Sequence, residues 1–184
     1  MNLVTPTHVV PQILEALELA VADGLSIPLV YNCGGYESVE TLRLLDGIVD
    51  IYMPDMKYAD SSIARQYPGI EDYAAVKEMH RQAGDLQIDD QGIAVRGLLV
   101  RHLVRPHGLA GTHKTAEFLA DEVSPNTYVN VMAQYHPCHR AYDFPLLSRV
   151  VTKEEYLEVV TLALQHGLKL LDQLHYPRTA RVSF

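Results

Sequence analysis

Cysteine, long apolar runs and positive charge are all scarce in this sequence of 184 residues. Its two cysteines, Cys33 and Cys138, are too few for a disulfide framework and fit a reducing compartment. No segment approaches the ~20 uninterrupted apolar residues of a membrane helix, and no basic-then-apolar signal sequence opens the chain. The net charge of -8 argues against nucleic-acid binding, which needs a basic face. We therefore expect a cytoplasmic protein with neither a membrane nor a nucleic-acid partner.

What the sequence does contain is globular in composition, with 48% hydrophobic and 21% charged residues. No low-complexity linker interrupts it, so residues 1–184 are expected to form one domain with a short irregular tail from about residue 169. Apolar runs alternate with helical periodicities and predict an α/β fold with parallel strands. The expected strands are 2–4, 29–31, 48–53, 97–103 and 128–132; the expected helices are 7–22, 38–45, 61–66, 72–83, 114–121 and 152–166; a hairpin is expected at 86–96.

Two α/β architectures suit such strands: a doubly wound sheet and part of a (β/α) barrel. Polar residues follow every expected strand, which is typical of a barrel whose site is assembled from its strand ends. A doubly wound sheet would concentrate its ligand residues at one crevice, usually beside a Gly-rich turn that opens a helix. The Gly34-Gly35 pair lacks the spacing of a dinucleotide fingerprint. The pattern therefore favours a partial (β/α) barrel.

The stretch at 49–58 contains an apolar strand followed by an Asp-x-Lys pair, Asp55 and Lys57. Residues two positions apart in a strand face the same side, and two charged residues there indicate that the apolar strand has reached its open end. In α/β proteins this end is where ligands bind. The pair is either a positioned ligand clamp or a plain cross-loop ion pair, and residue type alone does not decide between them.

Five motifs occur in order at residues 2–8, 29–36, 50–58, 101–104 and 132–135. Together they resemble a known family, the radical S-adenosylmethionine (SAM) proteins similar to pyruvate formate-lyase activating enzyme, a branch of uncharacterised iron-sulfur proteins. The resemblance implies a partial (β/α) barrel that holds a four-iron (4Fe-4S) cluster and SAM at its open end. It also implies reductive cleavage of SAM to a 5′-deoxyadenosyl radical, which abstracts hydrogen from a protein or small-molecule substrate. The implied partners are a protein like a glycyl radical enzyme and an electron donor such as flavodoxin or ferredoxin.

The resemblance also assigns residues to the SAM site. Asp55 and Lys57 match the Asp-x-Lys strand end that contacts SAM in activating enzymes, and a carboxylate-ammonium pair complements the zwitterionic methionine moiety. Thr5, Pro6 and Thr7 occupy the place of a Gly-Gly-Glu motif that contacts the SAM amino group, with the glutamate absent. Asn32 and Met53 match positions beside a cation site next to SAM. Arg101 matches a strand-end arginine that binds a carboxylate. Gln134 and His136 match positions near the ribose of SAM.

One element of the family pattern is missing, the Cys-x3-Cys-x2-Cys loop whose three thiolates hold the cluster. Cys33 and Cys138 do not replace these ligands, so we expect this chain to be inactive alone and to carry no cluster. The resemblance places its first residues at the second strand of the barrel. We therefore expect an amino-terminally truncated chain, a fragment that lacks the first βα unit of a radical SAM barrel.

Two alternatives remain open. The first is a noncatalytic binding or interaction subunit that has kept the barrel and lost the chemistry. The second is a zinc- or iron-dependent barrel hydrolase, because His102, His107 and His113 flank one strand end and the run from His136 to His139 contains further metal ligands. The second is disfavoured, since paired ligands of the His-x-His kind are missing from the strand ends.

Overall fold

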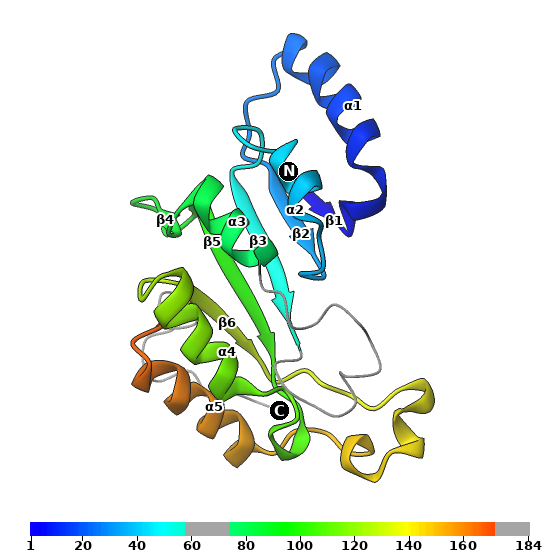
Figure 1. Cartoon of the computed structure of the whole chain (residues 1–184), viewed down its shortest axis with the longest axis vertical. Helices are drawn as coiled ribbons and strands as arrows, with labels where there is room; N and C mark the ends of the chain where they lie inside the picture. Colours follow the sequence, from blue (N-terminus) through cyan, green and yellow to red (C-terminus); the bar gives the residue numbers. More distant parts are fainter. Residues whose placement is uncertain (58–73, 172–184) are drawn as a thin grey trace.

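A computed structural model describes residues 1–57 and 74–171 of the chain and shows an α/β fold built on a mostly parallel sheet. The sheet has seven strands, and the order β1-β2-β3-β5-β6-β7 follows the order of the chain (Figure 1). The parallel strands are β1 (Asn2–Val4), β2 (Val30–Cys33), β3 (Ile51–Met56), β5 (Ala94–Leu103), β6 (Tyr128–Met132) and β7 (Lys169–Leu170). The remaining strand, β4 (Gln87–Ile88), pairs with β5 in the antiparallel direction.

Helices connect the parallel strands. They are α1 (Val10–Ala22), α2 (Val39–Arg43), α3 (Ala74–Ala83), α4 (Thr112–Phe118) and α5 (Lys153–Gln165). A 3-10 turn at Pro6–Val9 precedes α1, and a π-helical turn at Leu119–Val123 continues α4. Further 3-10 turns lie at Pro106–Gly108, His139–Asp143 and Pro145–Leu147. Figure 1 shows α4 and α5 side by side beyond β6, and the long connection between β6 and α5 extends away from the helices.

The main core lies between the helices and one face of the sheet. Strand side chains alternate between faces, and the set that includes Tyr52, Leu98, Val100 and Val129 packs against residues from all five helices. A sheet whose strand order follows the chain sends every right-handed crossover to the same side, which places the helices together. A doubly wound sheet would cover both faces. The observed arrangement is compatible with a partial (β/α) barrel.

The other face of the sheet bears no helix among the described residues. A small apolar cluster of Ile51, Leu86 and Leu99 covers its amino-terminal half, with Leu86 supplied by the segment before β4. The carboxyl-terminal half of the same face carries polar side chains from β2, β3, β5 and β6. Apolar filling at one end of this face and polar residues at the other are the features expected of a barrel interior with a site at its carboxyl end.

Local sequence explains where several elements begin. Thr152 caps α5 in a reciprocal capping box with Glu155, and the Ser38 side chain accepts a hydrogen bond from Thr41 N at the start of α2. Gly97 lies inside β5 and has a φ of 118°, a backbone conformation that residues other than glycine rarely adopt.

Within the described residues, the expected order of elements is confirmed, with shifted boundaries. The strands at 2–4 and 128–132 have the predicted bounds, whereas β3 runs over Ile51–Met56 instead of 48–53 and β5 begins three residues early at Ala94. The chain is not yet irregular at residue 169, because Lys169–Leu170 pair with β6. The helix expected at 61–66 and the start of the one at 72–83 lie outside the described residues, as does the tail beyond 171.

Candidate functional site

Three charged side chains meet at the carboxyl ends of β3 and β5. Asp55 and Arg101 are paired in register on these strands, with 2.6 Å between Nη2 of Arg101 and Oδ1 of Asp55. Lys57 lies two residues after Asp55, on the same side of the chain, and forms an ion pair with the other carboxylate oxygen. The Asp-x-Lys pair and the strand-end arginine, predicted separately from the sequence, are therefore one cluster.

Burial makes this cluster different from a surface ion pair. The Asp55 side chain is 9% exposed, that of Arg101 23% and that of Lys57 34%. Oδ1 of Asp55 accepts no aligned hydrogen bond, and Nε of Arg101 is buried without a hydrogen-bond partner among the described residues. The contact between them is thus an ion pair with unused hydrogen-bonding capacity on both sides. Two cations and one anion leave the cluster with one surplus positive charge.

Asn32 lies on β2, beside β3. It pairs in register with Met53 and is 8% exposed, and its side-chain amide has no hydrogen-bond partner in the described part of the chain. The resemblance placed both residues beside SAM, and the structure brings them to the same sheet edge as the charged cluster. Asparagine is depleted in strand interiors, so an asparagine at this position of β2 is consistent with a binding role.

The loop after β1 has a strained start. Thr5 adopts φ 54° and ψ 49°, a left-handed conformation that is an outlier for a β-branched residue, while its N–H donates to the carbonyl of Asn32 at 2.8 Å. Pro6 is buried, and Thr7 donates a 2.8 Å hydrogen bond from Oγ1 to Oε1 of Glu37. The hydrogen bond between Thr5 and Asn32 joins this segment to the end of β2, and backbone strain of this kind is common at ligand sites.

Glu37 is a candidate site residue that sequence reasoning missed. It is 8% exposed, and its Oε2 is buried without a hydrogen-bond partner in the described residues. It lies in the loop between β2 and α2, where no motif or periodicity distinguishes it from any other acidic loop residue. The feature that identifies it is its hydrogen bond with Thr7 in the folded protein, and that bond joins residues thirty positions apart in the sequence.

Cys33 occupies a buried position next to this glutamate. Burial raises the pKa of the Cys33 thiol, and the negative charge of Glu37 raises it further. Burial likewise raises the pKa of Tyr31, two residues earlier on the same face, to about 12. Because metal ligation and nucleophilic attack require the thiolate, Cys33 is an inert, protonated side chain. The other cysteine, Cys138, is exposed.

Gln134 and His136 do not join the charged cluster by any contact in the structure. Both are exposed in the connection between β6 and α5, and Gln134 lies 3.8 Å from the sulfur of Met132. The hydroxyl of Tyr135, between them, donates to the Leu147 carbonyl at 2.9 Å, which folds the connection back on itself. Their predicted role near the ribose of SAM stays a prediction.

His102 faces the helices rather than the site. Its Nδ1 lies 2.8 Å from the Met56 carbonyl, which requires Nδ1 to carry the proton, and its Nε2 lies 2.9 Å from Thr112 Oγ1, which then donates. Burial lowers the pKa of His102 to about 4. Both ring nitrogens are occupied, so His102 connects the end of β3 to α4 and is not available as a metal ligand.

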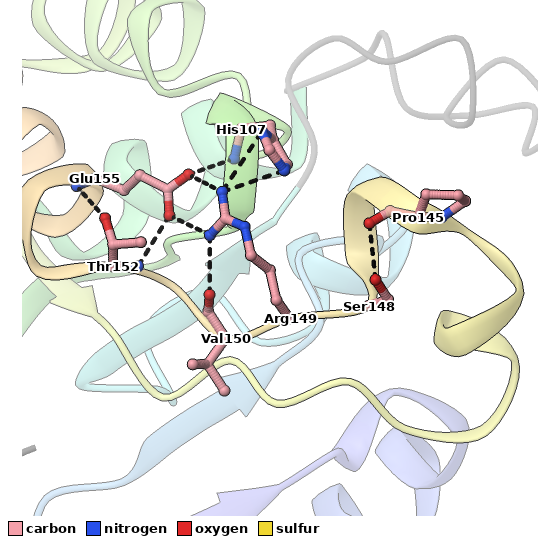
Figure 2. A network of polar contacts seen from close by, with 7 residues as sticks. All are labelled: His107, Pro145, Ser148, Arg149, Val150, Thr152 and Glu155. Carbon is pink, nitrogen blue, oxygen red and sulfur yellow. Dashed lines mark hydrogen bonds and ion pairs between the residues drawn. The ribbon is translucent and has the colours of Figure 1, made fainter.

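A second polar network fastens the loops after β5 and β6 to the start of α5. The Glu155 carboxylate accepts hydrogen bonds from the backbone N–H of His107 at 2.7 Å and of Thr152 at 2.9 Å, and from both terminal nitrogens of Arg149 (Figure 2). The hydrogen bonds from the Arg149 guanidinium, and to a smaller extent those from the two backbone N–H groups, hold the pKa of Glu155 well below its usual range. The network fixes the rim around the strand ends.

An open cavity of about 420 Å³ lies between the loop after β5 and α5. Its lining includes Arg105, Thr112, Glu158 and Leu162, and it contains none of the nine residues that the resemblance assigns to SAM binding. Among residues 1–57 and 74–171, no three His, Cys, Asp or Glu side chains come together in a way that could hold a metal ion. The histidines named as candidate hydrolase ligands therefore do not gather in this part of the chain.

Comparisons with known proteins add one relative. The chain is 31% identical over 163 residues, or 88% of its length, to an uncharacterised protein of Methanocaldococcus jannaschii. The aligned region is 45% of that protein, so the chain spans about half the length of the curated relative it matches. No protein-family model and no solved structure matches the chain.

The described helices can also be compared with the dimensions of a bilayer. Spanning one takes about 20 predominantly apolar residues in a row. In the described ranges, none of the helices has the length and apolar character to do so.

Proposed function

We propose that this chain forms the SAM-binding part of a radical SAM protein similar to pyruvate formate-lyase activating enzymes. The observation that carries the proposal is the position of Asp55 between Lys57 and Arg101 at the carboxyl ends of neighbouring parallel strands. A plain surface ion pair would be exposed and would need one partner, whereas this carboxylate is nearly buried and has two. Buried charges at strand ends are a feature of ligand sites in α/β proteins.

The residues present suit SAM in charge. Its methionine moiety carries an ammonium, a carboxylate and a sulfonium, so it needs both an anionic and a cationic partner. Asp55 would face the positive groups, and Arg101 with Lys57 the carboxylate. Thr5 to Thr7 and Asn32 would line the same edge with hydroxyl, backbone and amide groups. SAM, when bound, supplies the group that abstracts a hydrogen atom from the substrate.

The residues present do not suit a four-iron cluster. Three thiolates at one corner are needed, and the chain has two cysteines, one of them buried with a raised pKa and the other exposed. We therefore assign no cluster ligand and no redox step to this chain. The proposal for the chain itself is limited to binding and orienting SAM.

The wider activity is a proposal at the level of the whole protein. The relative of known length is about twice as long as the aligned region, so further sequence accompanies this part of the fold in that protein. In such a protein, a substrate like a glycyl radical enzyme and an electron donor such as flavodoxin or ferredoxin would be the partners. The relative is described only as uncharacterised and contributes no activity to the argument.

A noncatalytic binding subunit is the second candidate. Both candidates use the same strand ends. They differ in that a radical SAM protein must bind SAM there, while a binding subunit that has lost the chemistry need not retain it.

The test is calorimetric titration of SAM into the 184-residue chain and into Asp55→Asn. We expect measurable binding by the wild type and a loss of about tenfold or more in the variant, because a charge-assisted contact is worth roughly 1.5 to 3 kcal/mol. Asp90→Asn, in the exposed turn of the β4–β5 hairpin, makes the same chemical change away from the site. Equal SAM affinity in all three proteins, or none in the wild type, would contradict the proposal.

A further inference from the structure

Asn130 lies next to Arg101 on the helix-free face of the sheet. The two residues are paired in register on β6 and β5, which puts their backbones about 4.8 Å apart. Val129 and Val131 point into the main core with the helices, so Asn130 between them points to the opposite face. Arg101 reaches this face in the same way, because its neighbours Val100 and His102 are the buried ones on the helix side.

The Asn130 side chain has no structural task that the fold explains. It is half-buried on β6, one residue beyond the part of this strand that pairs with the short edge strand β7, and its amide makes no hydrogen bond or other polar contact with the described residues. Asparagine is depleted in strand interiors, where apolar and β-branched residues are favoured. An apolar residue would suit the sheet better, which indicates that this position serves binding rather than folding.

The polar groups of Arg101 and Asn130 that have no partner among the described residues can all donate hydrogen bonds. Nε of Arg101 is buried without a hydrogen-bond partner in the described part of the chain, and the Asn130 amide offers two N–H groups. The adjoining cluster of Asp55, Lys57 and Arg101 carries one surplus positive charge, and the buried carboxylate of Glu37, in the loop after β2, is the other anion of the wider site. A group with two acceptor oxygens and a single negative charge satisfies both requirements, and that group is a carboxylate. A phosphate would bring up to two negative charges against one.

We propose that Asn130 is a ligand-binding residue which, together with Nε of Arg101, holds one carboxylate group. The inference rests on the proposed function in placing SAM at the same strand ends, where the carboxylate would be that of its methionine moiety. The same chemistry would also bind the carboxylate of a separate small organic acid. Asn130 then decides whether a ligand with a carboxylate binds more tightly than one without it.

The experiment compares ligands with and without a carboxylate by calorimetry. The probes are SAM, L-methionine and pyruvate, which carry the group, and 5′-deoxyadenosine, which does not. The variants are Asn130→Leu, which keeps the size and removes the donors, and Asn130→Asp, which adds a negative charge. Asn126→Asp, in the loop before β6, adds the same charge at the other end of the strand, beside Asp85, and thermal melts followed by circular dichroism establish that each variant is folded.

We expect SAM affinity to fall at least tenfold in both Asn130 variants and to stay unchanged in Asn126→Asp, while the affinity of any 5′-deoxyadenosine binding is the same in all folded proteins. SAM binding that depends on Asp55 but not on Asn130 would overturn this inference and leave the proposed function standing. Binding of pyruvate but not SAM, lost in Asn130→Leu, would support the carboxylate subsite and contradict the proposed function. Wild-type affinity for every probe in folded Asn130→Leu, or no binding of any carboxylate, would overturn the subsite.

Discussion

The Asp55 carboxylate and the Arg101 guanidinium form an ion pair across two parallel strands, with 2.6 Å between Oδ1 and Nη2. Such a pair is poorly hydrated, because the Asp55 side chain is 9% exposed. Removing one partner of a buried pair leaves the other charge without compensation and costs more than the pair itself contributes. Here Lys57 remains beside Asp55 when Arg101 is lost, which reduces that cost.

We expect Arg101→Met to lower the free energy of unfolding by about 2 kcal/mol, and Asp55→Asn with Arg101→Met to show a coupling energy of about 1–3 kcal/mol. Urea unfolding followed by circular dichroism measures both in a double-mutant cycle. The exposed pair of Lys77 and Glu122, at 46% and 55% side-chain exposure, is the control and should couple by less than about 1 kcal/mol. Equal coupling in the two pairs would show that Asp55 and Arg101 behave as surface charges.

A second prediction concerns Gly35, which holds the loop after β2 against the end of β3. Its φ is 85°, and a Cβ at this position would lie 2.5 Å from the Asp55 carbonyl oxygen. Gly47 has a similar φ of 79°, but a Cβ there would meet nothing within 4 Å. The two glycines therefore share the backbone requirement and differ in the close approach.

Gly47→Ala should cost about 1 kcal/mol of stability, and Gly35→Ala about 1–3 kcal/mol more, with a displaced Asp55 and weaker SAM binding. Urea unfolding of both variants, together with SAM titration, checks this expectation. If Gly35→Ala costs no more than Gly47→Ala, the loop adapts without moving the strand end, and Gly35 has no part in positioning Asp55.

Much of the fold could be predicted from the sequence because its signals are local. Apolar runs marked β1 and β6 at their observed bounds, and the helical periodicity over 152–166 marked α5 to within one residue at each end. Lys169–Leu170 escaped prediction because two residues carry no periodicity, and they become a strand through pairing with β6. The early start of β5 likewise follows from its pairing with β4.

The site could be predicted only in part, since its parts come together through strand register. The sequence indicated Asp55, Lys57 and Arg101 as strand-end residues but gave no reason to pair Asp55 with Arg101. Glu37 joins the site through a contact with Thr7 across thirty positions, which no local pattern reveals. Asn130 was not predicted as a site residue, although the valines at 129 and 131 on either side of it are a local signal that its side chain lies on the opposite face.

The third prediction uses the buried histidine. Burial lowers the pKa of His102 to about 4 in the folded protein, whereas an exposed histidine has a pKa of about 6.5. Between these values the unfolded chain binds a proton that the folded chain does not, so stability falls as the pH drops from about 6.5 to about 4. The shift corresponds to roughly 3 kcal/mol at most.

His102→Asn, whose amide can still donate to the Met56 carbonyl, should be less stable at pH 8 but should lose less stability between pH 6.5 and pH 4. The exposed His113 is the control, and His113→Gln should keep the wild-type slope. Unfolding free energies across this range provide the measurement. Parallel profiles for wild type and His102→Asn would mean that His102 already takes up its proton in the folded state.

The fourth prediction concerns the network in Figure 2. Arg149 and two backbone N–H groups lower the pKa of Glu155, so this carboxylate contributes stability above its unfolded pKa that is lost as the pH falls through and below that value. Glu155→Gln should lower the melting temperature at neutral pH and flatten its decline in acid. Glu154→Gln, its exposed neighbour, should do neither. A melting temperature unaffected in both variants would show that the loops after β5 and β6 hold their positions without this carboxylate.

The last prediction concerns the iron-sulfur chemistry that the resemblance implies. After anaerobic reconstitution with iron and sulfide, the purified 184-residue chain should carry no stoichiometric cluster and should not cleave SAM. Cluster assembly needs three thiolates at one corner, while Cys33 is buried with a raised pKa and Cys138 is exposed on a distant connection. Any iron retained should be substoichiometric and equal in wild type, Cys33→Ser and Cys138→Ser, since neither thiol holds it. Iron analysis, visible thiolate-to-iron absorption and chromatographic detection of 5′-deoxyadenosine are the readouts. A stoichiometric cluster that disappears in either cysteine variant and forms 5′-deoxyadenosine on reduction would show that this chain supplies its own ligands, and the restriction of its role to SAM binding would be wrong.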